Sequence, residues 1–366
     1  MRDNRVPTVR EHGGNLRKLA HQAGCKPHEI LDFSANINPL GFPSWVRPLI
    51  ESCIDDLVHY PDPSYFDLKE KMSSVWGLDP KQIVLGNGSS EILWALIPAL
   101  KIQLAMIVVP SFMDYEKCAQ LYDLPIHRVL LSESEGFAFN ASQLRRSLDS
   151  IDRAQLCGVF LGSPNNPNGL TFPMGEFLEL VCQYPDVFFI LDQAFIDFTE
   201  ADFEILRDQP KNLIVLRSWT KILALPGLRL GFAVAQPQLA LALNQQIPSW
   251  SLNALAQNVM LRALDDFEFF RQSAHQVTVW RKDFVAHLAL IRGLQVYPSD
   301  ANFLLLRLNH LRYSVARLSE RLLKEHRIAI RRCENYWGLD DRYFRVAVRL
   351  PEQNLRLLRA FNEILR

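Results

Sequence analysis

Arg217-Ser218-Trp219-Thr220-Lys221, followed by Gly227-Leu228-Arg229-Leu230-Gly231, is the most informative stretch of this chain. It continues an apolar run, Leu213–Ser218, that is typical of a buried strand. Partial burial near a second cation lowers the pKa of an amine, so the spacing favours Lys221 as a nucleophile. Ser218, Thr220 and Arg229 offer a phosphate two hydroxyls and a guanidinium. Taken alone, the motif fits a surface lysine in a loop equally well.

Length and composition indicate a globular protein of about two domains, since the chain has 366 residues and a domain has roughly 150. Hydrophobic residues make up 48% and charged residues 22%, as in a soluble enzyme. Forty basic residues balance forty acidic ones. A neutral chain has no field to attract a polyanion, so we expect no nucleic-acid partner, and any bound anion must be held locally.

The chain shows no segment typical of export or of a membrane span. Its amino terminus is polar, and the most apolar stretch, 92–110, is interrupted by Pro98, Lys101 and Gln103. The six cysteines form no CxxC pair and have no histidine at zinc-finger spacing. We therefore expect a cytoplasmic protein with reduced thiols, no metal site and no membrane partner.

Short apolar runs alternate with amphipathic stretches from Gln82 to Ala235, a rhythm that predicts a mostly parallel sheet with crossover helices. The predicted strands are Ile83–Gly86, Ala105–Val109, Ile126–Leu131, Leu156–Gly162, Val187–Asp192, Leu213–Ser218 and Leu230–Ala235. The predicted helices are Ser89–Leu100, Ala141–Leu148 and Met174–Tyr184. Ligands of such sheets bind beyond the carboxyl ends of the strands.

The segment Asn253–Leu290 predicts one long helix or a pair of helices. Beyond it, strands Leu294–Tyr297, Phe303–Leu308, Ile328–Arg331 and Phe344–Val348 and helices Ser314–Glu325 and Glu352–Leu365 predict a smaller α+β domain. We therefore predict an amino-terminal arm over 1–35 that packs with the small domain, a large domain over 36–270 and the small domain over 271–366.

Four further motifs follow predicted strands. Ser89 and Ser90 open a helix after Gly86-Asn87-Gly88, which fits an anion site or a plain tight turn and cap. Asp192 ends a buried strand, where a pyridinium N–H, a helix cap or an arginine would satisfy its charge. Asn166 lies in a Pro- and Gly-rich turn, and Phe112 would stack on a planar ligand or pack in the core.

The order of these motifs resembles the pyridoxal-phosphate enzymes of the aspartate aminotransferase fold over nearly the whole chain. Within them it is closest to the histidinol-phosphate aminotransferase branch and its threonine-phosphate decarboxylase family. The resemblance extends to three amino-terminal motifs, which are His12-Gly13-Gly14-Asn15, the run from Asp32 to Gly41, and His59-Tyr60-Pro61-Asp62-Pro63.

The resemblance implies a role for each motif in binding pyridoxal 5′-phosphate. Lys221 is the lysine that joins the cofactor aldehyde, Asp192 pairs with the ring nitrogen, and Asn166 donates to the phenolic oxygen. Phe112 stacks on the ring. The phosphate is held by Ser89, Ser90, Ser218, Thr220 and Arg229, with Tyr60 reaching it from a second subunit of a homodimer.

The same resemblance implies a phosphorylated amino acid as substrate. Arg345 would bind its carboxylate, and Arg331 its phosphate, together with His12 and Asn36. The Cα bond held perpendicular to the cofactor ring breaks, so an upright carboxylate means decarboxylation of L-threonine O-3-phosphate, and an upright Cα–H means transamination. Histidinol-phosphate aminotransferase is thus the alternative activity, and a regulator that binds the cofactor without turnover is the alternative class of protein.

Three positions depart from the family pattern. Phe195 stands where many relatives carry a tyrosine that donates to the phenolic oxygen, Gln193 replaces a frequent glutamate, and Arg332 stands where the decarboxylases often have an acid. These changes bear on the substrate more than on the cofactor.

Overall fold

A seven-stranded sheet forms the centre of the larger part of the molecule in the computed structural model, which describes residues 12–152, 154–199, 204–207, 209–310 and 312–366. Its strand order is β2-β8-β7-β6-β5-β3-β4, and β8 runs in the direction opposite to the other strands. The strands are β2 (Ile83–Asn87), β3 (Leu104–Val109), β4 (Ile126–Leu130), β5 (Cys157–Gly162), β6 (Phe188–Asp192), β7 (Leu213–Ser218) and β8 (Leu230–Val234). Every predicted strand of this sheet is confirmed to within one residue at each end.

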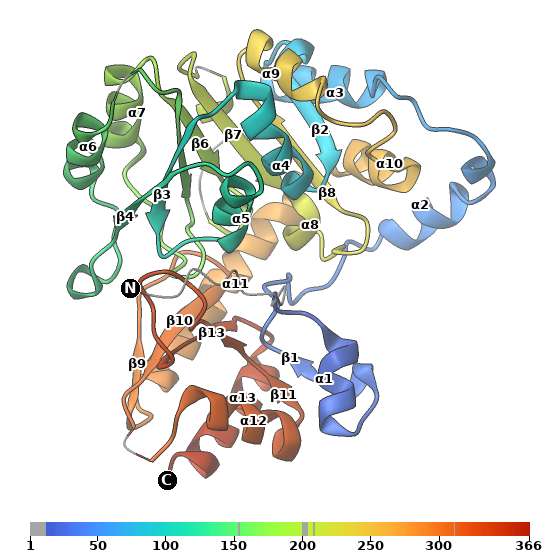
Figure 1. The fold of residues 1–366 in the computed structure, drawn as a ribbon. Helices are drawn as coiled ribbons and strands as arrows, with labels where there is room; N and C mark the ends of the chain where they lie inside the picture. The colour runs from blue at the N-terminus through green and yellow to red at the C-terminus, as the bar shows by residue number, and fades with distance from the viewer. Residues whose placement is uncertain (1–11, 153, 200–203, 208, 311) are drawn as a thin grey trace.

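Helices cover both faces of this sheet (Figure 1). One face packs through side chains such as Val84, Ile107 and Phe160 on α4 (Ser89–Leu100), α5 (Met113–Leu121) and α9 (Pro237–Asn244). The other face packs through Leu85 and Val159 on a larger core that includes α3 (Phe66–Trp76), α6 (Ala141–Ser150), α7 (Met174–Gln183) and α10 (Ala254–Ala263). Burial on both faces explains why the other strands read as continuous apolar runs, whereas the edge strand β4 is half-buried and includes His127 and Arg128.

The smaller part is built on a four-stranded antiparallel sheet of order β12-β13-β10-β9, with α12 (Val315–His326) and α13 (Pro351–Ile364) packed against it. Its strands are β9 (Leu294–Val296), β10 (Phe303–Leu308), β12 (Arg331–Arg332) and β13 (Tyr343–Ala347). The predicted strand Ile328–Arg331 is divided, because β11 (Ile328–Ala329) pairs with the amino-terminal strand β1 (Leu31–Asp32) and only β12 joins the sheet.

The amino-terminal segment lies beside the carboxyl-terminal elements (Figure 1). Its helix α1 (Leu16–Ala23), which the sequence did not predict, begins at the side-chain cap of Asn15 and ends at Gly24 with a φ of 62°. Ala20 packs with Leu323 of α12. Residues 1–11 of the predicted arm lie outside the described residues.

The segment predicted as one helix or two is a pair, α10 and the 22-residue α11 (Phe267–Leu288). The predicted boundary between residues 270 and 271 falls inside α11, and the domain limits stay a prediction. Helix α2 (Val46–Ser52) packs on α10. Within the described part of the chain, no helix combines the length and hydrophobicity that a bilayer crossing demands.

Close packing brings the start of α4 against the antiparallel strand β8. A Cβ atom on Gly231 would lie 2.0 Å from the Ser89 backbone nitrogen, so only glycine fits at this position. The contact places the amino terminus of α4 at the same edge of the sheet as the carboxyl ends of β5, β6 and β7. This edge carries the predicted cofactor residues Ser89, Asp192 and Lys221.

Candidate active site

Lys221 lies on the short helix α8 (Trp219–Ile222), which follows β7 directly. Its Nζ donates to the Ser218 hydroxyl at 3.2 Å and lies 5.0 Å from the centre of the Phe195 ring. Burial lowers the pKa of this amine to about 8, against the charge of Asp192, and the nearby guanidinium of Arg229 lowers it further. The amine is therefore partly neutral near physiological pH.

Asp192 is the last residue of β6 and faces the lysine. One oxygen accepts from the backbone N–H of Ala194 at 2.9 Å, and the other accepts from the Tyr115 hydroxyl at 2.8 Å. Burial raises the pKa of Asp192, while the charge of Lys221 and the Tyr115 hydrogen bond act in the opposite direction. Tyr115 lies three residues after Phe112, and the sequence missed it because α5 was not among the predicted helices.

The start of α4 and Arg229 together form a cradle for an anion. Gly88 precedes the helix with a φ of 77°, and a Cβ atom there would lie 2.8 Å from Nη2 of Arg229. The guanidinium therefore lies against the first turn, where Ser89, Ser90 and the free backbone N–H groups favour negative charge.

Thr220 ties the lysine helix to β8. Its hydroxyl donates to the Leu230 carbonyl at 3.1 Å and accepts from the Leu230 N–H at 3.0 Å. A hydroxyl proton held by a carbonyl is committed to that contact, so the phosphate contact of Thr220 stays a prediction.

Arg345 and Asn166 meet where the small sheet faces the large one. The Asn166 Oδ1 accepts a short hydrogen bond from Nη1 of Arg345, whose Nη2 donates to the Ser34 carbonyl at 3.0 Å. The guanidinium is buried and lies 5.2 Å from the Phe303 ring centre. Among the described residues its Nε has no hydrogen-bond partner, so a donor remains for a ligand.

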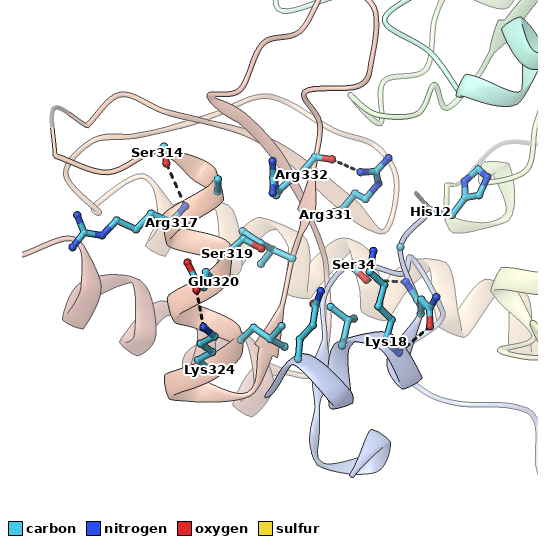
Figure 2. A pocket seen from close by; sticks show the side chains of 18 residues that line it. His12, Lys18, Ser34, Ser314, Arg317, Ser319, Glu320, Lys324, Arg331 and Arg332 are labelled. Carbon is cyan, nitrogen blue, oxygen red and sulfur yellow. Dashed lines mark hydrogen bonds and ion pairs between the residues drawn. The ribbon is translucent and has the colours of Figure 1, made fainter. Parts of the chain in front are cut away.

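Arg331 lies directly opposite Arg345, because β12 and β13 pair these two residues in register. Both are buried, at 7% and 6% exposure. Arg331 donates to the Arg332 carbonyl and to Asn335 Oδ1, the latter at 3.0 Å. Figure 2 shows its guanidinium between Arg332 and His12, at the side of a pocket of about 910 Å³ that α1 and α12 also line.

The remaining predicted substrate residues come from the amino-terminal segment. His12 lies 3.4 Å from Asp114 Oδ1, and its ring centre is 5.9 Å from that of Phe112. Asn36 is buried, and its carbonyl accepts from Asn302 Nδ2 at 3.0 Å. His12 thus lies near Phe112, the residue predicted to stack on the cofactor, and it lines the same pocket as Arg331.

Asn38 is a buried residue whose part in the site sequence reasoning missed. Its N–H donates to the Lys221 carbonyl at 3.0 Å, and its Nδ2 donates to the Ile222 carbonyl at 2.7 Å and to Ser273 Oγ at 2.8 Å. The residue therefore fixes the backbone that carries the lysine. It belongs to a motif that the resemblance included, but nothing local indicates these distant partners.

Tyr60 is placed differently from the other predicted residues. It is 83% exposed, and its ring centre lies 4.9 Å from that of Trp250 at the surface. Its predicted contact with the cofactor phosphate involves another subunit, so the single chain leaves it a prediction.

The three residues that depart from the family pattern, Gln193, Phe195 and Arg332, each contact specific neighbours. Gln193 is buried and accepts from Arg217 at 3.2 Å, and Arg217 forms a buried ion pair with Asp197 at 2.7 Å. Phe195 packs edge-on against Phe303, with ring centres 4.9 Å apart. Arg332 pairs with the carboxylate of Glu334, which offsets the charge it adds beside the pocket.

These groups fit pyridoxal 5′-phosphate. An amine of lowered pKa suits its aldehyde, a buried carboxylate suits its ring nitrogen, and the cradle at α4 suits its phosphate. Among the described residues no group of three or more His, Cys, Asp and Glu side chains is placed to hold a metal ion. The amine, the carboxylate and the cradle together define an enzyme that works through an organic cofactor of this kind.

Residues 28–361 match the family described as aminotransferase class I and II, and the chain belongs to this family. Pyridoxal 5′-phosphate is its cofactor. The threonine-phosphate decarboxylase of Salmonella typhimurium is 39% identical over 362 residues, which are 97% of this chain and 96% of that protein.

The adenosylcobalamin biosynthesis bifunctional protein CobDQ of Leptospira interrogans is 40% identical over 355 residues, and the chain spans 41% of its length. A crystal structure of the histidinol-phosphate aminotransferase from Clostridium acetobutylicum superposes with a TM-score of 0.83 and 31% identity, over 92% of this chain and 99% of that one. The aspartate aminotransferase-like fold is thereby confirmed.

The lowered pKa of Lys221 leads to a testable pH dependence. With a pKa of about 8, about a tenth of this amine is neutral at pH 7 and about nine tenths at pH 9. In the cofactor-free protein we therefore expect its rate of acetylation by acetic anhydride to rise about tenfold over this range. Peptide mass spectrometry measures the rate, with the exposed Lys81 in the same digest as reference. A midpoint near pH 10 would contradict the burial argument.

Proposed function

We propose that this chain is a carboxy-lyase that uses pyridoxal 5′-phosphate to decarboxylate L-threonine O-3-phosphate to (R)-1-aminopropan-2-yl phosphate, for the nucleotide loop of cobalamin. Relatives named for this activity, or for adenosylcobalamin biosynthesis, match at 39–40% identity over 97% of the chain. The structural observation that carries the proposal is the pair of opposed buried arginines, Arg331 and Arg345, of which Arg345 is close enough to Lys221 to lower the pKa of its amine.

Two buried cations at directly opposed positions repel each other. The Cα atoms of such a pair lie about 4.5–5.5 Å apart, and like charges there are destabilising. Burial and the neighbouring Arg331 lower the pKa of Arg345, while Tyr336, Cys333 and Asp32 act in the opposite direction. A ligand with two anionic groups a few bonds apart offsets both charges. A phosphorylated amino acid, with carboxylate at one end and phosphate at the other, has this form.

The side chains divide the work of the reaction. When bound, the cofactor supplies an electron-accepting ring for the electron pair of the bond that breaks at Cα. Arg345 would hold the substrate carboxylate and Arg331 its phosphate, and these two contacts would orient the bonds at Cα. The Lys221 amine, with its lowered pKa, is able to carry a proton at Nζ, and Asp192 would hold the ring nitrogen protonated.

Product identity tests the reaction. The purified enzyme with pyridoxal 5′-phosphate is expected to release carbon dioxide from L-threonine O-3-phosphate without 2-oxoglutarate, and mass spectrometry should show the amine phosphate. L-Serine O-phosphate and L-histidinol phosphate complete the panel. A strict need for 2-oxoglutarate would refute the decarboxylase and favour histidinol-phosphate aminotransferase.

Lys221→Ala should remove both turnover and the visible absorbance of the bound cofactor, with the circular dichroism spectrum unchanged.

Neutral variants of the two arginines test the two contacts with the substrate. Arg331→Gln and Arg345→Gln are each expected to lower kcat/KM about 10²–10³-fold. Each substitution removes a pair of charge-assisted hydrogen bonds, and one such pair contributes about 3–4 kcal/mol. Arg331→Gln should also abolish the preference for threonine phosphate over threonine. Arg342→Gln is the matched control, since Arg342 is exposed and pairs with Asp340 next to the same strand. An Arg331→Gln enzyme that keeps this preference would contradict the assignment.

A cytoplasmic homodimer with shared sites belongs to the same proposal. Tyr60 supports the homodimer, since the side chain is exposed next to Trp250 and large apolar residues close to it in the chain are exposed as well. These are Val58 at 80% and Phe66 at 64% exposure. Contact with a second copy would cover this surface and bring Tyr60 to the partner's cofactor.

Mixing two inactive variants tests the shared site. Lys221→Ala and Tyr60→Ala place their defects in the same site of a hybrid dimer and leave the other site intact. Random assortment should therefore restore about a quarter of the wild-type activity. Lys221→Ala mixed with Asp192→Ala is the control that should restore none, because both residues serve their own chain's site. Equal restoration in both mixtures, or none in either, would rule out the exchange of Tyr60.

A further inference from the structure

Asn166 is held by two donors that act on the same atom. Its Oδ1 accepts from Arg345 Nη1 and also from the Tyr336 hydroxyl at 3.3 Å. An amide whose oxygen is engaged on one side presents its Nδ2 on the other. These two contacts therefore decide which end of Asn166 is available to a ligand.

The orientation of Asn166 matters more in this chain than in relatives that carry a tyrosine at position 195. Phe195 has no hydroxyl, and its ring is fixed edge-on to Phe303. The phenolic oxygen of the cofactor thus loses one donor, and Asn166 has to supply the hydrogen bond through Nδ2. A flipped amide would present an oxygen to an oxygen instead.

Arg345 is not a constant partner for Asn166. In the proposed function the same guanidinium binds the substrate carboxylate, and its buried Nη2 already donates to Ser34. Once a carboxylate competes for Nη1, the hydrogen bond from Tyr336 is the one that continues to hold the amide.

Tyr336 is well placed for a fixed contact. It is buried, and its N–H donates to the Cys333 carbonyl at 3.0 Å in the loop between β12 and β13. The next residue, Trp337, donates to Glu116 at 3.1 Å and stacks on Arg128, with 4.0 Å from the guanidinium to the ring centre. The loop is therefore fastened to α5 and β4 of the large sheet on one side of the tyrosine.

We propose that Tyr336 is a positioning residue whose hydroxyl keeps the Asn166 amide turned so that Nδ2 donates to the phenolic oxygen of the cofactor. The inference rests on the cofactor site of the proposed function, and it does not depend on which amino acid is the substrate. The ring of Tyr336 also lies 5.5 Å from the Arg331 guanidinium, so a variant must keep the ring to isolate the hydroxyl.

Tyr336→Phe in the holoenzyme tests the proposal without turnover, in saturating succinate, a carboxylate that can occupy Arg345 but has no amino group to react. The bound cofactor has a protonated and a deprotonated form, and its phenolic oxygen bears a full negative charge only in the deprotonated form. A hydrogen bond donated to this oxygen therefore stabilises the deprotonated form. Loss of the donor should therefore raise the pH of the visible absorbance transition, by about half to one pH unit for one neutral hydrogen bond. Tyr184→Phe is the matched control, because Tyr184 is also buried and its hydroxyl donates to Asp149 at 2.8 Å near the end of α7.

A double-variant cycle separates positioning from general loosening. If Tyr336 acts through Asn166, Tyr336→Phe should cause no further shift in an Asn166→Ala background. An unchanged transition in the single variant, the same shift with Tyr184→Phe, or an equal shift in the Asn166→Ala background would each overturn the proposal. A failed decarboxylation assay leaves this readout intact, so the two proposals fail separately.

Discussion

The attraction between Lys221 and Asp192 across the carboxyl edge of the large sheet is the interaction on which the site depends. Burial disfavours the charged form of each, lowering the pKa of the amine and raising that of the acid, and each charge partly compensates the other. The ends of β6 and β7, adjacent in the sheet, bring the two together. Asn38 and Tyr115 then hold them in place. Because the sheet edge is rigid, the two side chains keep their positions although their charges compensate each other only in part, and both stay available to a ligand.

Anions are bound in this site by local groups of donors and cations. The chain is neutral overall, so long-range attraction contributes little. The cradle of α4 with Arg229 lies on the large sheet, and the opposed Arg331 and Arg345 lie on the small one. Cofactor phosphate and substrate anions would therefore be held by different parts of the molecule. Their relative placement, and hence the angle of the Cα bonds, follows from how the small sheet packs on the large one.

The sequence was sufficient for the elements and motifs that depend on local pattern. Strands buried on both faces leave continuous apolar runs, which is why β2 to β8 were predicted within one residue. The break at Ile330 between β11 and β12 could not be predicted in this way. The two short strands pair with different partners, and a change of pairing partner does not alter the hydrophobic pattern of the sequence. Tyr115 and Tyr336 were also missed. Each donates to a residue 77 or 170 positions away, so only the folded chain shows the contact.

The departures from the family pattern show how a site tolerates change around a fixed centre. Gln193 lies in a buried group with Arg217 and Asp197, where an uncharged acceptor suffices because Asp197 already balances the arginine. At Arg332, the charge is met two residues later by Glu334. Phe195 is different, since its ring has no hydroxyl to donate. The donor to the phenolic oxygen would then be Asn166, which the hydroxyl of the buried Tyr336 orients in our proposal.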